Sequence, residues 1–93
     1  MAADPIKLLV VEDDEALRMV LETRLGGWGY EVLLAADGAE GRQMSESEDP
    51  ALVLSDVVLP DISGLELLRS LKGGNPSRPV VLMTAQGDRK SVV

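Results

Sequence analysis

The sequence predicts an α/β fold in which helices cover both faces of a parallel sheet. Four short apolar stretches alternate along the chain with three stretches of helical character. The apolar stretches are rich in leucine and valine and contain few polar residues, as is typical of strands that are buried on both faces. Because 93 residues suffice for one domain, we expect a single domain over residues 1–93.

The first strand is expected over residues 6–11, which are apolar except for Lys7 and follow Pro5. After the four consecutive acids at residues 12–15, leucine and valine recur at helical spacing. The pair Gly26-Gly27 is expected to end this helix. This pattern predicts an amphipathic helix whose apolar face carries Leu17, Val20, Leu21 and Leu25.

A second strand is expected over residues 30–36, followed by a helix that ends near Glu48. Asp37 precedes Glu40 by three positions, which is a pattern typical of a helix start, although the apolar stripe that follows is weak. The third strand covers residues 51–56.

Pro60 prevents the third strand from continuing, and Ser63 with Glu66 repeats the helix-start pattern. Gly73-Gly74 closes this helix, for which the sequence predicts an apolar stripe of Leu65, Leu68 and Leu71. A fourth strand is expected over residues 80–84, and residues 88–93 are expected to begin a fourth helix.

The composition excludes several classes of function. Nine basic residues stand against 16 acids, and a net charge of −7 argues against direct binding of nucleic acid or of an anionic membrane. The absence of cysteine and histidine excludes disulfides, thiol nucleophiles and zinc sites built on these residues. The sequence lacks a signal peptide and a run long enough to cross a bilayer, so we expect a cytoplasmic protein.

Polar side chains follow three of the predicted strands at their carboxyl ends. Glu12 and Asp13 follow the first strand, Asp56 ends the third and Thr84 ends the fourth. If the first and third strands are neighbours, about 4.8 Å apart, these carboxylates crowd one pocket. Either one of them holds a proton or a divalent cation neutralises them, and hard oxygen ligands favour Mg²⁺.

A purely structural explanation also exists for part of this cluster. Acids directly before a helix are commonly N-caps, and Asp13 or Asp14 could have only that role. Asp56 is harder to explain in this way, because a carboxylate at the end of an apolar strand needs a cation, hydrogen bonds or water. Thr84 alone is unremarkable, since threonine is both a good strand residue and a good cap.

These residues resemble the motifs of the receiver domain of two-component response regulators. The segment 10–14 resembles the acidic motif after the first strand, and residues 83–85 resemble the hydroxyl motif after the fourth. The segment from Asp56 to Gly64 resembles the phosphoacceptor loop, with Pro60 four residues and Gly64 eight residues after Asp56. The resemblance implies a flavodoxin-like fold and a role in two-component signal transduction.

The resemblance also implies a Mg²⁺ site and a nucleophile. Asp13 and Asp56 would ligate Mg²⁺ directly, Glu12 mostly through water, and Val58 through its backbone carbonyl. Asp56 would take a phosphoryl group from the phosphohistidine of a sensor histidine kinase or a phosphotransfer protein. Any enzymatic activity would be limited to self-phosphorylation and autodephosphorylation at Asp56.

Two further positions would contact the phosphoryl oxygens. The resemblance implies that Thr84 donates its hydroxyl group and that Ala85 contributes its backbone amide. Phosphoryl transfer asks a protein mainly for positioning and for neutralisation of oxygen charge, which these groups suit.

The chain departs from the receiver pattern at its C-terminal end. A complete receiver has a fifth strand that ends in lysine and is followed by a helix, so we expect strand order 2-1-3-4 and an incomplete domain without that fifth βα unit. Lys90 lies in the wrong place to replace the lysine. The alternative to an active phosphoacceptor is a fragment unable to switch, acting as a binding module or a homo-oligomer through an exposed edge at residues 80–83.

Overall fold

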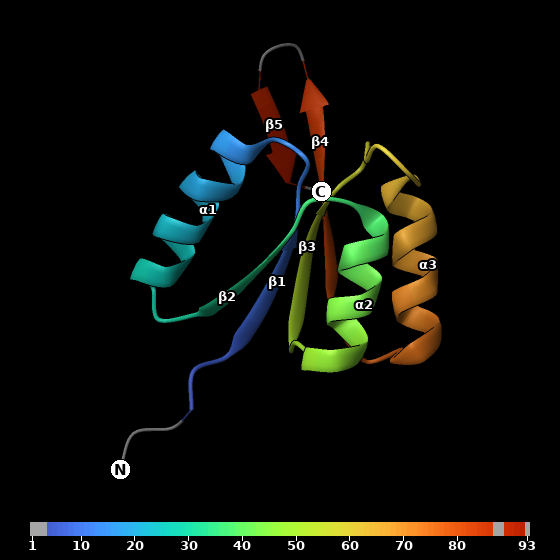
Figure 1. The fold of residues 1–93 in the computed structure, drawn as a ribbon, viewed down its shortest axis with the longest axis horizontal. Coiled ribbons are helices and arrows are strands. Elements are labelled where there is room, and N and C mark those ends of the chain that lie inside the picture. The colour runs from blue at the N-terminus through green and yellow to red at the C-terminus, as the bar shows by residue number, and fades with distance from the viewer. Residues whose placement is uncertain (1–3, 87–88, 93) are drawn as a thin grey trace.

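The computed structural model describes residues 4–86 and 89–92, with side chains described as far as residue 83. Within these residues a five-stranded sheet has the order β2-β1-β3-β4-β5 (Figure 1). Strands β1 to β4 are parallel to one another, which confirms the predicted order 2-1-3-4 and the flavodoxin-like fold. The strands are β1 (Lys7–Val11), β2 (Glu31–Ala35), β3 (Leu52–Asp56), β4 (Val80–Gln86) and β5 (Arg89–Val92).

Helices cover both faces of the sheet (Figure 1). Helix α1 packs on one face beside β2, and helices α2 and α3 lie next to each other on the opposite face. The helices are α1 (Glu15–Gly27), α2 (Gly38–Glu48) and α3 (Gly64–Gly74).

Each helix begins at a side chain that accepts a hydrogen bond from a backbone amide in the first turn. Asp37 caps α2 through the amide of Glu40, and Ser63 caps α3, as the sequence patterns predict. Asp14 caps α1, accepting from the amide of Leu17 at 3.2 Å. Asp14 is therefore the N-cap among the four consecutive acids. Glu12 and Asp13 do not cap α1 and directly follow the end of β1.

The main core lies between the sheet and helices α2 and α3. Leu67 is fully buried there, whereas Leu65 is 51% exposed, so the predicted stripe of α3 is wrong at Leu65. The buried face of α3 instead runs through Leu67 and Leu71, which are four residues apart. The buried members of this core are Leu9, Val11, Ala35, Val53, Leu59, Leu67 and Leu71.

The predicted helix over residues 88–93 is wrong. Residues 89–92 form β5, which pairs antiparallel with β4, from Met83 with Val92 to Gln86 with Arg89. A neighbouring strand satisfies the backbone donors and acceptors that β4 would otherwise present at an open edge. The dipeptide Gly87-Asp88 between two strand-forming runs is a hairpin signal that explains the outcome. The β5 register begins at Met83, so it covers the C-terminal end of the predicted open edge at residues 80–83.

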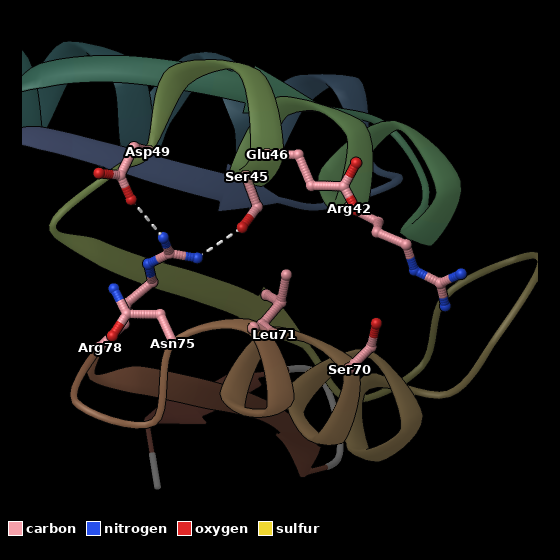
Figure 2. Close-up of a pocket in the computed structure, with 9 residues that line it drawn as sticks. Arg42, Ser45, Glu46, Asp49, Ser70, Leu71, Asn75 and Arg78 are labelled. Atoms are coloured by element: carbon pink, nitrogen blue, oxygen red, sulfur yellow. Dashed lines mark hydrogen bonds and ion pairs between the residues drawn. The ribbon is translucent and has the colours of Figure 1, made fainter.

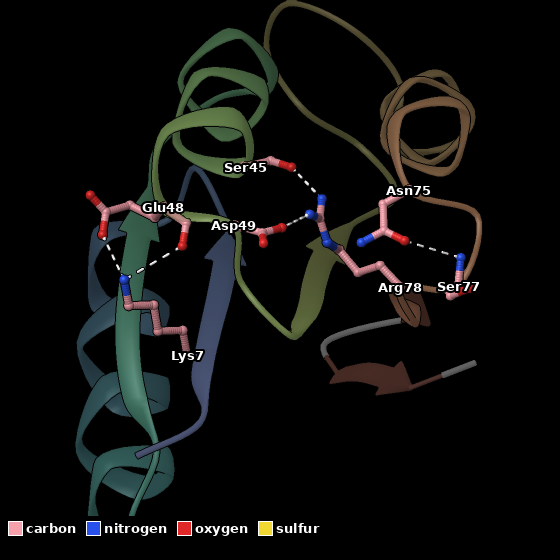
Figure 3. A network of polar contacts seen from close by, with 7 residues as sticks. All are labelled: Lys7, Ser45, Glu48, Asp49, Asn75, Ser77 and Arg78. Atoms are coloured by element: carbon pink, nitrogen blue, oxygen red, sulfur yellow. Dashed lines mark hydrogen bonds and ion pairs between the residues drawn. The ribbon is translucent and has the colours of Figure 1, made fainter. Parts of the chain in front are cut away.

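A polar network joins the C-terminal end of α2 to two other parts of the chain (Figure 3). Arg78, just before β4, donates hydrogen bonds to Ser45 and Asp49, both at 2.6 Å. Lys7 of β1 contacts the carboxylate of Glu48 at 3.3 Å. These contacts hold the amino edge of the sheet together, opposite the edge where the strands end.

None of the helices in the described residues is both long and apolar enough to span a membrane.

Candidate functional site

Three carboxylates meet at the carboxyl edge of the sheet. Glu12, Asp13 and Asp56 each offer an oxygen atom, and these atoms all lie within 4.8 Å of one another. Glu12 and Asp56 are buried, with 0% and 5% of their surface exposed, whereas Asp13 is exposed. The structure thus brings together the three acids that the sequence places after two strands.

The parallel pairing of β1 with β3 explains why these acids meet. Val11 lies opposite Ser55, so the residue after each, Glu12 and Asp56, lies at the same level of the sheet. The backbone amide of Glu12 continues the sheet on the other side by donating to the carbonyl of Ala35 at 3.0 Å. The site is therefore built at the ends of two interior strands, each of which pairs with a neighbour on both sides.

Local hydrogen bonds orient Glu12. The amide of Asp14 donates to its Oε2 at 2.9 Å, and Arg18 donates from Nη1 to its backbone carbonyl at 2.7 Å. Arg18 therefore binds the backbone of this segment, and the amide of Asp14 helps to hold the Glu12 carboxylate beside that of Asp56.

The donor set fits a hard divalent cation. Three carboxylates this close repel one another, and a cation between them removes the repulsion. Mg²⁺ binds oxygen ligands, uses one or two carboxylates directly and keeps several waters. Two buried acids with an exposed Asp13 provide ligands and a side open to solvent.

The loop after Asp56 is held close to the site. The amide of Val58 donates to Oδ1 of Asp56 at 3.2 Å, and Val58 forms an isolated bridge with Ser63. The amide of Gly64 donates to the carbonyl of Val57 at 2.6 Å. A Cβ atom at Gly64 would lie 2.3 Å from the carbonyl oxygen of Asp56, so only glycine permits this approach.

Residues 8–93 match the sequence family described as the response regulator receiver domain. The chain belongs to this family. It is therefore a receiver domain of the two-component signalling type, as the sequence motifs predict.

Curated relatives and solved structures are similar to most of this receiver. It is 42% identical to the probable transcriptional regulator ycf27 of Cyanophora paradoxa over 88% of the chain and 34% of that relative. It is 40% identical to the response regulator MprA of Mycobacterium tuberculosis over 87% of the chain and 35% of that relative. The chain thus spans about a third of the length of these relatives.

The crystal structure of a CheY-like response regulator receiver domain from Methanospirillum hungatei superposes with a TM-score of 0.85 at 34% identity, covering 89% of this chain and 66% of that one. A response regulator receiver domain from Clostridium thermocellum gives 0.84 at 29% identity, covering 89% and 68%. Receiver domains generally bind Mg²⁺ at an acidic pocket, and the carboxylates of Glu12, Asp13 and Asp56 form an acidic group of that kind in this receiver.

The remaining predicted residues of the receiver site lie on β4. The parallel ladder between β3 and β4 ends where Asp56 pairs with Met83, and Thr84 is the next residue along β4. Strand β4 runs on to Gln86, so Thr84 follows the end of this ladder and not the end of the strand. The structure describes side chains only as far as residue 83. The roles of Thr84 and Ala85 therefore stay predictions.

Asp61 is a residue of the site region that the sequence motifs miss. Its carboxylate accepts hydrogen bonds from the amides of Gly38 and Ala39, both at 2.8 Å, and from Ile62 at 3.0 Å. The bond from Gly38, supported by those from Ala39 and Ile62, lowers the pKa of Asp61 below its usual range. No local spacing rule predicts the contacts of Asp61 with α2, because Gly38 and Ala39 lie 23 and 22 residues away in sequence.

A cavity of about 320 Å³ lies between α2 and α3 (Figure 2). Arg78 and Asp49 contribute to its wall near the amino edge of the sheet. Ligands of open parallel sheets bind at the opposite, carboxyl edge. This cavity is therefore separate from the site around Asp56.

Proposed function

We propose that this receiver accepts a phosphoryl group on Asp56 and acts as a signalling switch in a two-component system. The observation that carries the proposal is the meeting of Glu12, Asp13 and Asp56 within 4.8 Å at the carboxyl edge of the sheet. Membership of the receiver family supports the same assignment.

In this proposal Asp13 and Asp56 hold Mg²⁺ directly, Glu12 holds it mostly through water, and Val58 contributes its backbone carbonyl. The cation would supply neutralisation of the charge on the phosphoryl oxygens. Glu12 is held in place by the amide of Asp14, so its carboxylate is oriented before the cation arrives. Asp13 is exposed and offers the entry side.

Asp56 performs the covalent step. A carboxylate oxygen of Asp56 attacks phosphorus while the bond from phosphorus to the histidine nitrogen of the donor breaks. The imidazole keeps the bonding electron pair and takes up a proton, and Asp56 becomes an acyl phosphate. The amide of Val58, which donates to Oδ1 of Asp56, helps to orient the nucleophile.

Thr84 and Ala85 complete the site in this proposal by donating a hydroxyl and an amide to the phosphoryl oxygens. Their place supports it, because Thr84 follows the residue of β4 that pairs with Asp56. Receiver domains generally interact with histidine kinases or phosphotransfer proteins, and we infer a partner of that type in the cytoplasm.

The test is phosphorylation by a small phosphodonor. The chain is incubated with acetyl phosphate and Mg²⁺, and intact mass is expected to show one added phosphoryl group. Borohydride reduction of the acyl phosphate followed by peptide mapping should place the modification at Asp56. Asp56→Asn should stay unmodified, while Asp49→Asn, a change at the opposite edge, should behave like the unaltered chain. An unaltered chain that gains no mass, or that is modified at another acid, would overturn the proposal.

A further inference from the structure

Asp61 connects the loop after Asp56 to a different helix. The loop of residues 57–63 joins β3 to α3, yet the carboxylate of Asp61 binds the start of α2. Its Oδ1 accepts from the amide of Gly38 and its Oδ2 from that of Ala39, both at 2.8 Å. These amides belong to the first two residues of α2, which have no acceptor within the helix.

The packing at Gly38 shows independently that loop and helix approach closely. A Cβ atom at Gly38 would lie 2.5 Å and 2.8 Å from two side-chain carbons of Ile62, and 3.1 Å from Oδ1 of Asp61. A side chain at position 38 would therefore force the side chain of Ile62 to shift. The hydrogen bonds from α2 to Asp61 and the presence of glycine at position 38 thus both allow the loop to lie close to α2.

The loop that Asp61 anchors also carries groups of the proposed phosphoryl site. Val58 donates its amide to Asp56 and is the proposed source of a backbone ligand to Mg²⁺. The bridge between Val58 and Ser63 closes the loop, so the position of Asp61 and that of Val58 are connected through a short segment.

We propose that Asp61 is a positioning residue that holds the loop of residues 57–63 in the geometry needed for Mg²⁺ binding beside Asp56. The inference rests on the proposed function, because it assigns Val58 and Asp56 to the Mg²⁺ site. The lowered pKa of Asp61, caused mainly by the amide of Gly38, agrees with an ionised acceptor at neutral pH.

The competing explanation is that Asp61 only caps α2. Asp37 allows the two explanations to be separated, because it caps the same helix through the amide of Glu40 at 2.8 Å without belonging to the loop. Loss of Asp37 and loss of Asp61 both weaken the start of α2. Of these two changes, only the loss of Asp61 also removes the contact that holds the loop against α2.

The experiment measures the Kd of Mg²⁺ by titration calorimetry, well below the melting temperature of each variant. Asp61→Ala is expected to weaken binding about tenfold, as is common for residues that orient metal ligands. Asp61→Asn keeps one acceptor oxygen and should weaken binding less. Gly38→Ala disturbs the contact from the helix side and should weaken binding, whereas Asp37→Ala should leave the Kd unchanged.

Equal Kd values for Asp61→Ala and Asp37→Ala would overturn the inference while leaving the proposed function intact. If Asp61→Ala fails to fold, the comparison of Asp61→Asn with Asp37→Asn decides in the same way. An unaltered chain that binds no Mg²⁺ and gains no phosphoryl group would instead overturn the proposed function, and this inference with it.

Discussion

Nη2 of Arg78 lies 2.6 Å from Oδ1 of Asp49, and this contact joins the end of α2 to the residue before Pro79 at the start of β4 (Figure 3). The two partners differ in environment, since the side chain of Arg78 is 6% exposed and that of Asp49 is 80% exposed. Arg78 also donates to Ser45, which is buried. The buried guanidinium therefore binds the last turn of α2 and the residue that directly follows this helix.

We predict that Arg78→Ala destabilises the fold by about 2 kcal/mol, because it removes packing and leaves the buried Ser45 hydroxyl without this donor. Lys7→Ala removes the other ion pair of the network, which is partly exposed and longer at 3.3 Å, and should cost less than about 0.5 kcal/mol. Urea unfolding followed by circular dichroism measures both. Equal losses for the two variants would contradict the distinction drawn from burial.

The buried face of α3 makes a second prediction. Leu67→Ala should cost about 3 kcal/mol, because Leu67 is fully buried against the sheet and its truncation leaves a cavity. Leu65→Ala, two positions earlier on an exposed site, should change stability by less than about 0.5 kcal/mol. Urea unfolding midpoints in the opposite order would show that α3 packs through its other face.

Two glycines of α3 should respond oppositely to alanine. At Gly64 a Cβ atom would lie 2.3 Å from the carbonyl oxygen of Asp56, so Gly64→Ala should destabilise the chain by about 1–3 kcal/mol and weaken Mg²⁺ binding. At Gly73 a Cβ atom meets nothing within 4 Å, and alanine favours a helix, so Gly73→Ala should be neutral or stabilising by up to about 1 kcal/mol. Thermal unfolding with and without Mg²⁺ distinguishes them, and a tolerated Gly64→Ala would contradict the close approach.

Local patterns were enough to predict the parallel sheet and the acidic group. Mostly apolar runs predict the strands, and the acids at their ends meet because parallel strands end at one edge. The helix starts at Asp37 and Ser63 follow from spacing alone, since each capping side chain accepts a bond from an amide three residues later.

Contacts between distant residues could not be predicted in this way. Asp61 accepts hydrogen bonds from amides 23 and 22 residues away in sequence, and Arg78 donates a hydrogen bond to Ser45, which is 33 residues away. The phase of α3 was also ambiguous, because leucines at 65, 67, 68 and 71 fit two overlapping apolar stripes. Only packing against the sheet chooses between them.

Repulsion within the acidic group makes a prediction about Asp13. Without divalent cations, Asp13→Asn should stabilise the fold by up to about 0.5 kcal/mol, because one of three carboxylates within 4.8 Å loses its charge at a position screened by solvent. With Mg²⁺ about tenfold above its Kd, the unaltered chain should gain about 1.4 kcal/mol, whereas Asp13→Asn should gain less. Urea unfolding in EDTA and in Mg²⁺ measures both gains. Equal Mg²⁺ stabilisation of the two chains would exclude Asp13 from the metal site.

The pH dependence of stability should carry a signature of Asp61. Its folded pKa is lowered, so its contribution to stability is present above its unfolded pKa of about 3.9 and disappears as the pH falls through the folded value. The difference in free energy of unfolding between the unaltered chain and Asp61→Asn should therefore be constant above about pH 5 and shrink below about pH 4. Urea unfolding at a series of pH values measures this difference.

Ser63→Ala is the matched control for this titration. Ser63 caps α3 by accepting from the amide of Glu66 at 3.1 Å, and its hydroxyl does not ionise in this range. The cost of Ser63→Ala, about 1 kcal/mol, should therefore stay the same across the pH series. A difference for Asp61→Asn that also remains constant to pH 3 would show that the amides of α2 do not bind the ionised form of Asp61 preferentially.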